Sequence, residues 1–119
     1  MKILIVDDEE QIRIMVGEFL ENEGHQILLA VNGSEGLETA RRESDGLNLI
    51  ILDNKMPVMS GLEMLQTLRK EGNQVAVIIV TGHSEMDEET LIRHEVRGLI
   101  EKPFSLETLK NLINENKSR

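Results

Sequence analysis

The chain alternates short, continuous apolar runs with longer segments in which apolar residues recur at the spacing of a helix. The apolar runs are predicted strands, at residues 3–6, 26–31, 49–52, 76–80 and 99–100. The first, third and fourth runs are apolar without interruption, which is typical of strands that are covered on both faces. Five strand–helix units in a row therefore predict an α/β fold in which helices cover both faces of a parallel sheet.

Residues that can cap a first helical turn precede most of the helical segments, and glycines follow two of them. Helices are predicted to begin near Glu10, Asn32, Ser60, Ser84 and Ser105. Glutamates three residues after the second and third of these positions fit the spacing of a capping box. The first helix is expected to span residues 10–22 and to stop before Gly24, as the third stops before Gly72. The polar residues 114–119 are expected to fray.

With 119 residues, the chain is expected to form one domain over residues 1–119, and it is short for an eight-stranded barrel. The prediction is therefore a doubly wound open parallel sheet of five βα units, the flavodoxin-like (βα)5 architecture. If the strand order is 2-1-3-4-5, the first and third strands are neighbours. Ligands of such sheets bind outside the carboxyl ends of the strands.

The net charge of −9, from 13 Lys and Arg against 22 Asp and Glu, argues against direct nucleic-acid binding, which requires a basic surface. It suits cation binding, or partners with basic or apolar faces. The absence of cysteine excludes disulfides and zinc sites built on thiolates. No signal-peptide pattern is visible and no apolar run approaches a membrane span of about 18 residues, so we expect a cytoplasmic location without membrane insertion.

Polar residues with functional chemistry follow four of the five predicted strands. Asp7 and Asp8 follow the first, Asp53 the third, Thr81 the fourth and Lys102 the fifth. Taken singly, each has a simpler explanation: acids favour a helix N-terminus, threonine hydroxyls a turn, and lysines the solvent. Together they lie at one edge of a parallel sheet, which predicts that they form a single site.

Carboxylates of Asp7, Asp8 and Asp53 in one cleft would repel one another and raise at least one pKa. A hard divalent cation such as Mg²⁺ relieves this repulsion, takes protein oxygens as ligands and bridges to a phosphate. The ammonium of Lys102 and the hydroxyl of Thr81 would complete a site for a phosphoryl group. A cation also explains why the apolar third strand ends in a carboxylate, which is costly to bury unpaired.

Four stretches of the sequence, read together, resemble one protein family. They are ILIVDDE, LIILDNKMPVMSG, VIIVTGH and IEKPFS, in this order and spread over the whole chain. The chain resembles the receiver domain of bacterial two-component response regulators, in particular that of the chemotaxis regulator, whose strand order is 2-1-3-4-5. The resemblance implies a phosphoacceptor signalling domain rather than an enzyme.

The resemblance implies that Asp53 accepts a phosphoryl group from the phosphohistidine of a sensor kinase, or from a small acyl phosphate, and becomes an aspartyl phosphate. It implies that Asp8 and Asp53 bind Mg²⁺, or Mn²⁺, directly and that Asp7 binds it through water. The backbone carbonyl of Lys55 would be a further ligand.

The resemblance also assigns the remaining site residues. Lys102 is expected to pair with Asp53 before transfer and with the phosphoryl group afterwards, while the Thr81 hydroxyl donates a hydrogen bond to a phosphoryl oxygen. Positions that match loop-shaping residues of the family are Pro57, Gly61 and Pro103. The peptide bond before Pro103 is expected to be cis. Water is expected to hydrolyse the aspartyl phosphate with assistance from the domain itself.

Some positions differ from the family pattern or are specific to this chain. Leu99 stands where the family usually has Tyr or Phe, so the switch cannot use an aromatic ring there. Either another rearrangement of the fourth helix and fifth strand carries the signal, or the switch is weak. Lys55 and His83 lie two residues beyond the aspartate and the threonine of the site, and we hypothesise that both set the lifetime of the phosphorylated state. His25 and His94 are expected to be ordinary surface residues.

The expected partners are a sensor histidine kinase or phosphotransfer protein upstream, and a downstream protein or output domain. The resemblance places the kinase contact on the first helix and the Pro103 loop, and the output contact on the fourth helix, fifth strand and fifth helix. Two alternatives are a receiver that binds partners without phosphorylation and a Mg²⁺-dependent phosphatase of the haloacid dehalogenase type. Such phosphatases carry two aspartates after the first strand with one residue between them, whereas Asp7 and Asp8 are adjacent.

Overall fold

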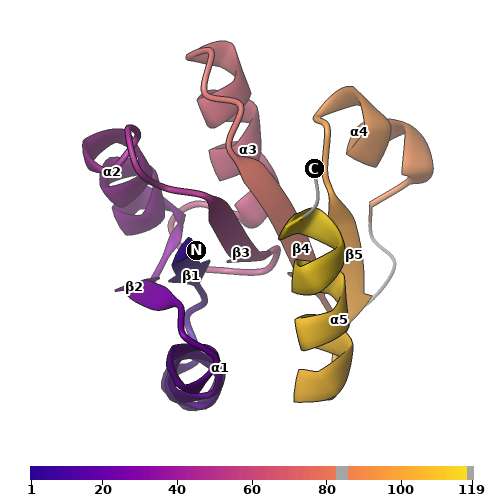
Figure 1. Cartoon of the computed structure of the whole chain (residues 1–119). Coiled ribbons are helices and arrows are strands. Elements are labelled where there is room, and N and C mark those ends of the chain that lie inside the picture. The colour runs from indigo at the N-terminus through magenta and orange to yellow at the C-terminus, as the bar shows by residue number, and fades with distance from the viewer. Residues whose placement is uncertain (83–85, 118–119) are drawn as a thin grey trace.

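Five parallel strands form one sheet in the computed structural model, which describes residues 1–82 and 86–117 (Figure 1). The strands are β1 (Lys2–Val6), β2 (Gln26–Ala30), β3 (Leu49–Asp53), β4 (Ala76–Thr81) and β5 (Gly98–Glu101). They lie in the order β2-β1-β3-β4-β5, and every neighbouring pair is parallel. The predicted doubly wound sheet with strand order 2-1-3-4-5 is therefore confirmed.

Over the same described residues, five helices alternate with the strands. They are α1 (Glu10–Asn22), α2 (Gly33–Arg42), α3 (Gly61–Lys70), α4 (Glu88–Arg93) and α5 (Leu106–Lys117). Figure 1 shows α1 and α5 on one face of the sheet and α2 and α3 on the other. Within the described residues, no helix is long and apolar enough to cross a bilayer.

The strand interiors form a core on both faces of the sheet. Facing α2 and α3 are the side chains of Leu4, Val6, Ile50 and Leu52. Facing α1 and α5 are those of Ile3, Ile5, Leu49 and Ile51. None of these side chains is more than 3% exposed, and burying each one contributes about 1.5–3 kcal/mol to stability. The carboxyl ends of β1 and β3 are thereby held in fixed positions.

The helix caps predicted at Asn32 and Ser60 form. The Asn32 side chain accepts a hydrogen bond (2.8 Å) from the backbone N–H three residues later and so begins α2. At the start of α3, Ser60 and Glu63 bond each other's backbone N–H groups in a capping box, each at 3.1 Å. Gly24 and Gly72 follow α1 and α3 with φ values of 95° and 81°, a conformation that favours glycine.

The start of α4 differs from the prediction. A start after Ser84 was expected from the sequence, but residues 83–85 lie outside the described part of the chain and the helix begins at Glu88. The cap is Asp87, whose side chain accepts a hydrogen bond (2.8 Å) from the Thr90 backbone N–H. No residue of α4 is buried.

The half-buried Arg69 of α3 joins the end of α4 to the rest of the fold. Its Nε donates a hydrogen bond to the His94 carbonyl at 2.8 Å. Its Nη1 donates to the carbonyls of Asn73 and Val75, each at 2.9 Å. One guanidinium group therefore ties α4 to the loop between α3 and β4.

The predicted fraying of residues 114–119 is wrong for 114–117, which belong to α5. Asn116 is only 8% exposed, and its Nδ2 donates a hydrogen bond (2.8 Å) to the Leu112 carbonyl of the same helix. A polar residue that bonds its own helix can be buried, so the polar composition of this segment was misleading. Residues 118–119 lie outside the described part of the chain.

His25 is buried rather than at the surface, since it is only 9% exposed. Its Nδ1 lies 3.2 Å from the amino nitrogen of Met1, and its backbone N–H donates to the Leu20 carbonyl at 3.1 Å. Burial and the neighbouring amino charge lower the pKa of His25. His94 is half-buried at the end of α4.

Candidate functional site

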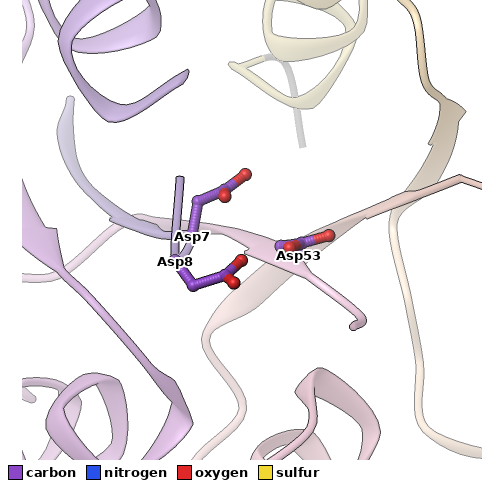
Figure 2. A group of neighbouring side chains, drawn as sticks. All are labelled: Asp7, Asp8 and Asp53. Carbon is purple, nitrogen blue, oxygen red and sulfur yellow. The ribbon is translucent and has the colours of Figure 1, made fainter. Parts of the chain in front are cut away.

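Three carboxylates converge at the carboxyl edge of the sheet. Asp7 and Asp8 follow β1, and Asp53 is the last residue of β3. One oxygen of each lies within 4.8 Å of one oxygen of the others (Figure 2). The cause is the strand order, because β1 and β3 are neighbours and Val6 lies in register with Leu52. The predicted convergence of these three residues is therefore confirmed.

The three carboxylates differ in exposure and in anchoring. Asp7 and Asp53 are 3% and 4% exposed, whereas Asp8 lies at the surface. Asp7 is held in place because its Oδ1 accepts the Glu9 backbone N–H (2.9 Å) and its carbonyl accepts Nη1 of Arg13 (2.7 Å). Two fixed, buried carboxylates beside an exposed one resemble a cation site that is open to solvent on one side.

The electrostatics of the site disfavour full ionisation without a cation. Burial and, to a smaller extent, the charge of Asp7 raise the pKa of the Asp53 carboxyl to about 6, although Lys102 lowers it in part. Burial also raises the pKa of Asp7, against the backbone hydrogen bond from Glu9 and the charge of Lys102. An additional positive charge among these oxygens would therefore be bound favourably.

Lys102 supplies one cation to this cluster. Its Nζ lies 3.2 Å from Glu9 Oε1, 3.4 Å from Asp53 Oδ1 and 3.5 Å from Asp7 Oδ2. Burial disfavours the ammonium, but the charges of Asp7 and Asp53 and the contact with Glu9 together outweigh burial and raise the pKa of Lys102. The peptide bond to Pro103 is cis, as the sequence implied.

Glu9 is a site residue that the sequence reasoning did not assign. Its carboxylate oxygen is the nearest of the three acceptors around Lys102 Nζ, although its side chain is 59% exposed. Its position directly after the aspartate pair was the available signal. The first acidic run was read only as an aspartate pair and a helix start, so the contact across 93 residues of sequence went unnoticed.

Thr81 ends β4, between the strands that carry Asp53 and the Lys102 loop. It is 1% exposed and lies in register with Glu101 of β5. Its carbonyl accepts the backbone N–H of Lys102 at 2.8 Å. On its other side, Val80 is in register with Asp53. The structure therefore places Thr81 at the same sheet edge as the other predicted site residues.

The loop after Asp53 is shaped by Gly61, as predicted. A Cβ at this glycine would lie 2.4 Å from the Asp53 carbonyl oxygen, which is closer than atoms can approach. The Gly61 backbone N–H donates to the Asn54 carbonyl at 2.9 Å, and the Pro57 carbonyl accepts the Met59 N–H at 2.8 Å. The loop folds back tightly on the end of β3, and Lys55 is exposed within it.

Two further positions can now be placed. Leu99 is half-buried, is in register with Ile79 of β4, and packs against the apolar cluster that faces α2 and α3. A leucine there fills core space but offers no hydroxyl. His83, for which a role in the lifetime of the phosphorylated state was hypothesised, lies outside the described residues.

The sheet order and the edge cluster of three carboxylates and one lysine define a class of protein, the receiver domains of two-component signalling systems. The chain belongs to the response regulator receiver domain family, whose model matches residues 3–114. Members of this family are signalling domains and are generally not classed as enzymes. The predicted family membership is confirmed.

Known relatives agree with this assignment. The chain is 34% identical over 118 residues to sporulation initiation phosphotransferase F of Bacillus subtilis, covering 96% of this chain and 91% of that protein. It is 39% identical to the uncharacterized transcriptional regulatory protein YkoG of the same species, covering 90% of this chain but only 46% of that protein. The chain thus spans less than half the length of some curated relatives.

Among solved structures, the response regulator protein TrrA from Thermotoga maritima, in complex with Mg²⁺-BeF, superposes with a TM-score of 0.82. It is 33% identical in sequence, and the match covers 97% of both chains. The two proteins therefore share the same fold over nearly the whole chain.

Proposed function

We propose that Asp53 is the phosphoacceptor of this receiver domain, which forms one unit over residues 1–119. The observation that carries the proposal is the placement of the Asp53 carboxylate. It ends a buried strand, is 4% exposed, and lies within reach of two other aspartates and of Lys102 Nζ at 3.4 Å. A nucleophile needs such fixed positioning among groups that neutralise the charge it receives.

The carboxylate cluster fits a divalent cation, Mg²⁺ or Mn²⁺. Asp8 and Asp53 would hold it directly, Asp7 through water, and the backbone carbonyl of Lys55 would complete the protein ligands. Support comes from the three carboxylate oxygens within 4.8 Å of one another and from the relative that was solved with Mg²⁺-BeF. When bound, the ion supplies neutralisation of the charge that gathers on the phosphoryl oxygens.

In the proposed reaction, a carboxylate oxygen of Asp53 attacks the phosphorus of a phosphohistidine. The new O–P bond forms as the N–P bond breaks, and the electron pair of that bond stays on the imidazole that leaves. Lys102 turns from the carboxylate to the transferred group, whose negative charge it neutralises. The Thr81 hydroxyl then donates a hydrogen bond to a phosphoryl oxygen.

The signal is reset when water attacks the phosphorus of the aspartyl phosphate and releases inorganic phosphate and the Asp53 carboxylate. We propose that the domain assists this step. The exposed Lys55 lies in the loop directly beyond the acceptor, so its side chain can reach the path of the incoming water. Substituting Lys55 with Gln should therefore change the half-life of the phosphorylated state, and an unchanged half-life would remove this assignment.

The proposed partners are a sensor histidine kinase or phosphotransfer protein and a downstream protein or output domain, all in the cytoplasm. A shallow apolar groove of about 330 Å³ next to the site suits the first of these. It is lined by Ile12 and Met15 of α1 and by Lys102, Pro103 and Phe104. The α4–β5–α5 face is proposed for the output contact.

Labelling with a small phosphodonor tests the proposal. Treatment with acetyl phosphate and Mg²⁺ should add the mass of one phosphoryl group to a peptide that contains Asp53, and the Asp53→Asn variant should gain none. Omitting Mg²⁺ should abolish labelling of the parent. Labelling at another residue, or equal labelling of the variant, would overturn the assignment.

The absence of an aromatic ring at Leu99 favours one alternative, a receiver that binds partners without phosphorylation. The same labelled sample separates the two. Under the phosphoacceptor proposal, amide NMR signals of α4 and β5 shift on labelling. Absence of any labelling at Asp53 would favour the alternative, and repeated turnover of a small phosphate ester would favour the phosphatase.

A further inference from the structure

The outer edge of β2 is open. Among the described residues no strand lies beyond β2, and Figure 1 shows it at the margin of the sheet, with α1 on one face and α2 on the other. The backbone N–H of Gln26 and the carbonyl of Ala30 bond the residues that flank β1. Alternate residues of an edge strand bond the neighbouring strand, so the N–H and C=O groups of Ile27 and Leu29 point away from the sheet.

This open stretch has defined ends. At one end the His25 backbone N–H donates to the Leu20 carbonyl at 3.1 Å, and at the other the Val31 backbone N–H donates to Glu35 Oε1 at 3.3 Å. Both donors are therefore already used within the chain. The backbone groups between these two ends belong to the outward-facing residues of β2, and they can pair with one short added strand.

The β2 edge also lacks the residues that usually prevent strand pairing. Residues 24–34 contain no Asp, Glu, Lys, Arg or Pro, and Leu29 and Val31 are 47% and 41% exposed. The strand at the other side of the sheet, β5, is preceded by Arg97 and ends in Glu101. Proteins protect edge strands with charges or proline because an open apolar edge pairs with other chains. The β2 edge therefore has the character of a strand that accepts a partner.

The helix beside this edge carries negative charge. A Cβ at Gly17 of α1 would lie 3.7 Å from Leu29 Cδ2, so α1 packs over β2 at this point. Ile14 and Glu21, three residues before and four residues after Gly17, lie on the same side of the helix, and Glu18 follows Ile14 by one turn. All three side chains are exposed. The edge is thus bordered by one apolar residue and two glutamates.

This charge decides between two occupants of the edge. The single cation of α1, Arg13, is half-buried and donates to the Asp7 carbonyl at 2.7 Å, so it is directed away from the two glutamates. A second copy of the chain would bring the same glutamates to the edge, and its net charge of −9 would add to the repulsion. A strand that carries basic as well as apolar side chains complements the edge instead.

We propose that the β2 edge binds an extended basic segment of a partner protein, which adds one strand to the sheet. The backbone of this segment bonds Ile27 and Leu29. One apolar side chain of the segment packs on Leu29 and Ile14, and lysine or arginine two residues to either side pairs with the glutamates of α1. Binding requires neither Mg²⁺ nor phosphorylation, so the inference goes beyond the proposed function.

Three short peptides test the proposal. The basic peptide is acetyl-Thr-Lys-Thr-Val-Thr-Lys-Thr-amide, the acidic peptide has Glu in place of Lys, and the third is the basic peptide with N-methyl groups on its three central amides. Each is titrated into ¹⁵N-labelled protein in metal-free buffer. The basic peptide should shift the amide signals of Ile27 and Leu29 in a saturable way. The acidic peptide should bind about tenfold more weakly, and the methylated peptide, which cannot donate the backbone hydrogen bonds, should not bind.

Variants separate the apolar and the charged parts of the surface. Leu29→Thr removes the apolar contact but keeps a residue that favours strands, and it should weaken binding of the basic peptide about fivefold. Ile92→Thr, the matched change at a 69% exposed position of α4, should leave binding unchanged. Glu21→Gln should weaken binding about twofold, whereas Glu107→Gln on α5 should not. If Leu29→Thr fails to fold, the three peptides and the Glu21→Gln result decide the question.

Each contrary outcome overturns a stated part of the proposal. If the basic peptide causes no saturable shift at Ile27 and Leu29, or shifts only residues around Asp53, the edge is not its binding surface. Equal binding of the methylated peptide would exclude strand addition, and equal binding of the acidic peptide would exclude a basic partner. If the peptide-free protein sediments as a dimer and the same two amide signals depend on its concentration, the occupant is a second copy of the chain.

Discussion

Within the central strands of the sheet, the interior and the carboxyl edge are built from different kinds of side chain. Ile51 of β3 is 3% exposed and packs among aliphatic neighbours that face α1 and α5. Asp53, two residues on and on the same side of the strand, is 4% exposed among carboxylates. Burial of the apolar Ile51 side chain stabilises the fold. Burial of Asp53 destabilises it, because the charged carboxylate loses its contact with water. Similar exposure thus reports opposite contributions to stability.

Of the changes considered, removing an interior side chain should have the largest effect on the free energy of unfolding. Ile51→Ala deletes buried methyl and methylene groups from a packed core and leaves a cavity, so unfolding free energy should fall by about 3 kcal/mol. Urea unfolding at neutral pH measures it. Ile92→Ala is the matched control, because that side chain is 69% exposed on α4 and its loss should be nearly neutral. Equal losses for both would contradict the assigned core.

The next effect concerns the turn that closes the edge. Gly61→Ala places a Cβ 2.4 Å from the Asp53 carbonyl oxygen and 2.9 Å from the Asn54 Cα, so backbone must shift. We expect a loss of about 2 kcal/mol in unfolding free energy, together with weaker phosphodonor labelling. Gly46→Ala is the control, since its nearest neighbour would be the Lys2 Nζ at 3.8 Å. An unchanged stability for Gly61→Ala would mean that the loop is less tight than described.

Replacing Asp53 itself should increase the stability of the metal-free protein rather than decrease it. The folded-state pKa of Asp53, about 6, is raised above its unfolded value near 3.8. The folded protein therefore binds the proton more tightly, and stability falls as pH rises from 4 to 6 and stays low above 6. Asp53→Asn should stabilise the metal-free protein by about 1–2 kcal/mol at pH 7.5 and by almost nothing near pH 4.

Unfolding curves at the two pH values, in the presence of EDTA, check this prediction. The sign at neutral pH is decisive. A variant less stable than the metal-free parent would show that Lys102 contributes more to the edge than carboxylate repulsion removes.

A bound divalent cation should offset the destabilisation caused by the clustered carboxylates at the carboxyl edge of the sheet. Because Mg²⁺ binds only the folded parent tightly, a concentration several times its dissociation constant should add about 1 kcal/mol of stability. Thermal unfolding with and without Mg²⁺ should show a smaller gain for Asp53→Asn. Equal gains would place the bound ion away from the carboxylate cluster.

The smallest effect is expected at Glu9. The Glu9→Gln variant should change stability by less than about 0.5 kcal/mol, because the side chain is largely exposed. It should weaken Mg²⁺ binding by roughly twofold through the loss of one nearby negative charge. Glu10→Gln, one residue further along, serves as the control. If both variants bind Mg²⁺ alike, the contact between Glu9 and Lys102 has no influence on the site.

Much of the fold follows from the sequence because its signals are local and repeated. Uninterrupted runs such as residues 49–52 predict strands covered on both faces, and capping pairs such as Ser60 and Glu63 predict helix starts. The site follows as well, since parallel strands bring their carboxyl ends to one edge. Predicted strand ends were one residue short at Asp53 and Thr81, because polar residues can continue a ladder that their neighbours fix.

The features that sequence reasoning missed depend on contacts made only in three dimensions. The bond between Glu9 and Lys102 joins distant parts of the chain, and nothing in the local pattern marks it. The buried His25 contacts the amino group of Met1, and the buried Asn116 donates a hydrogen bond within its own helix. In the sequence, Glu9 is indistinguishable from an ordinary charged surface residue. His25 and Asn116 lie in segments whose composition is typical of a loop and of a chain terminus.

The peripheral position of α4 has a practical use. None of its residues is buried, and Ile92 is 69% exposed at its surface. The sequence contains no cysteine, so Ile92→Cys would introduce a unique thiol for a fluorescent dye without disturbing the core. A single labelled molecule could then report in real time when this helix changes its surroundings, and the same readout would serve as a screen for compounds that lock it in place.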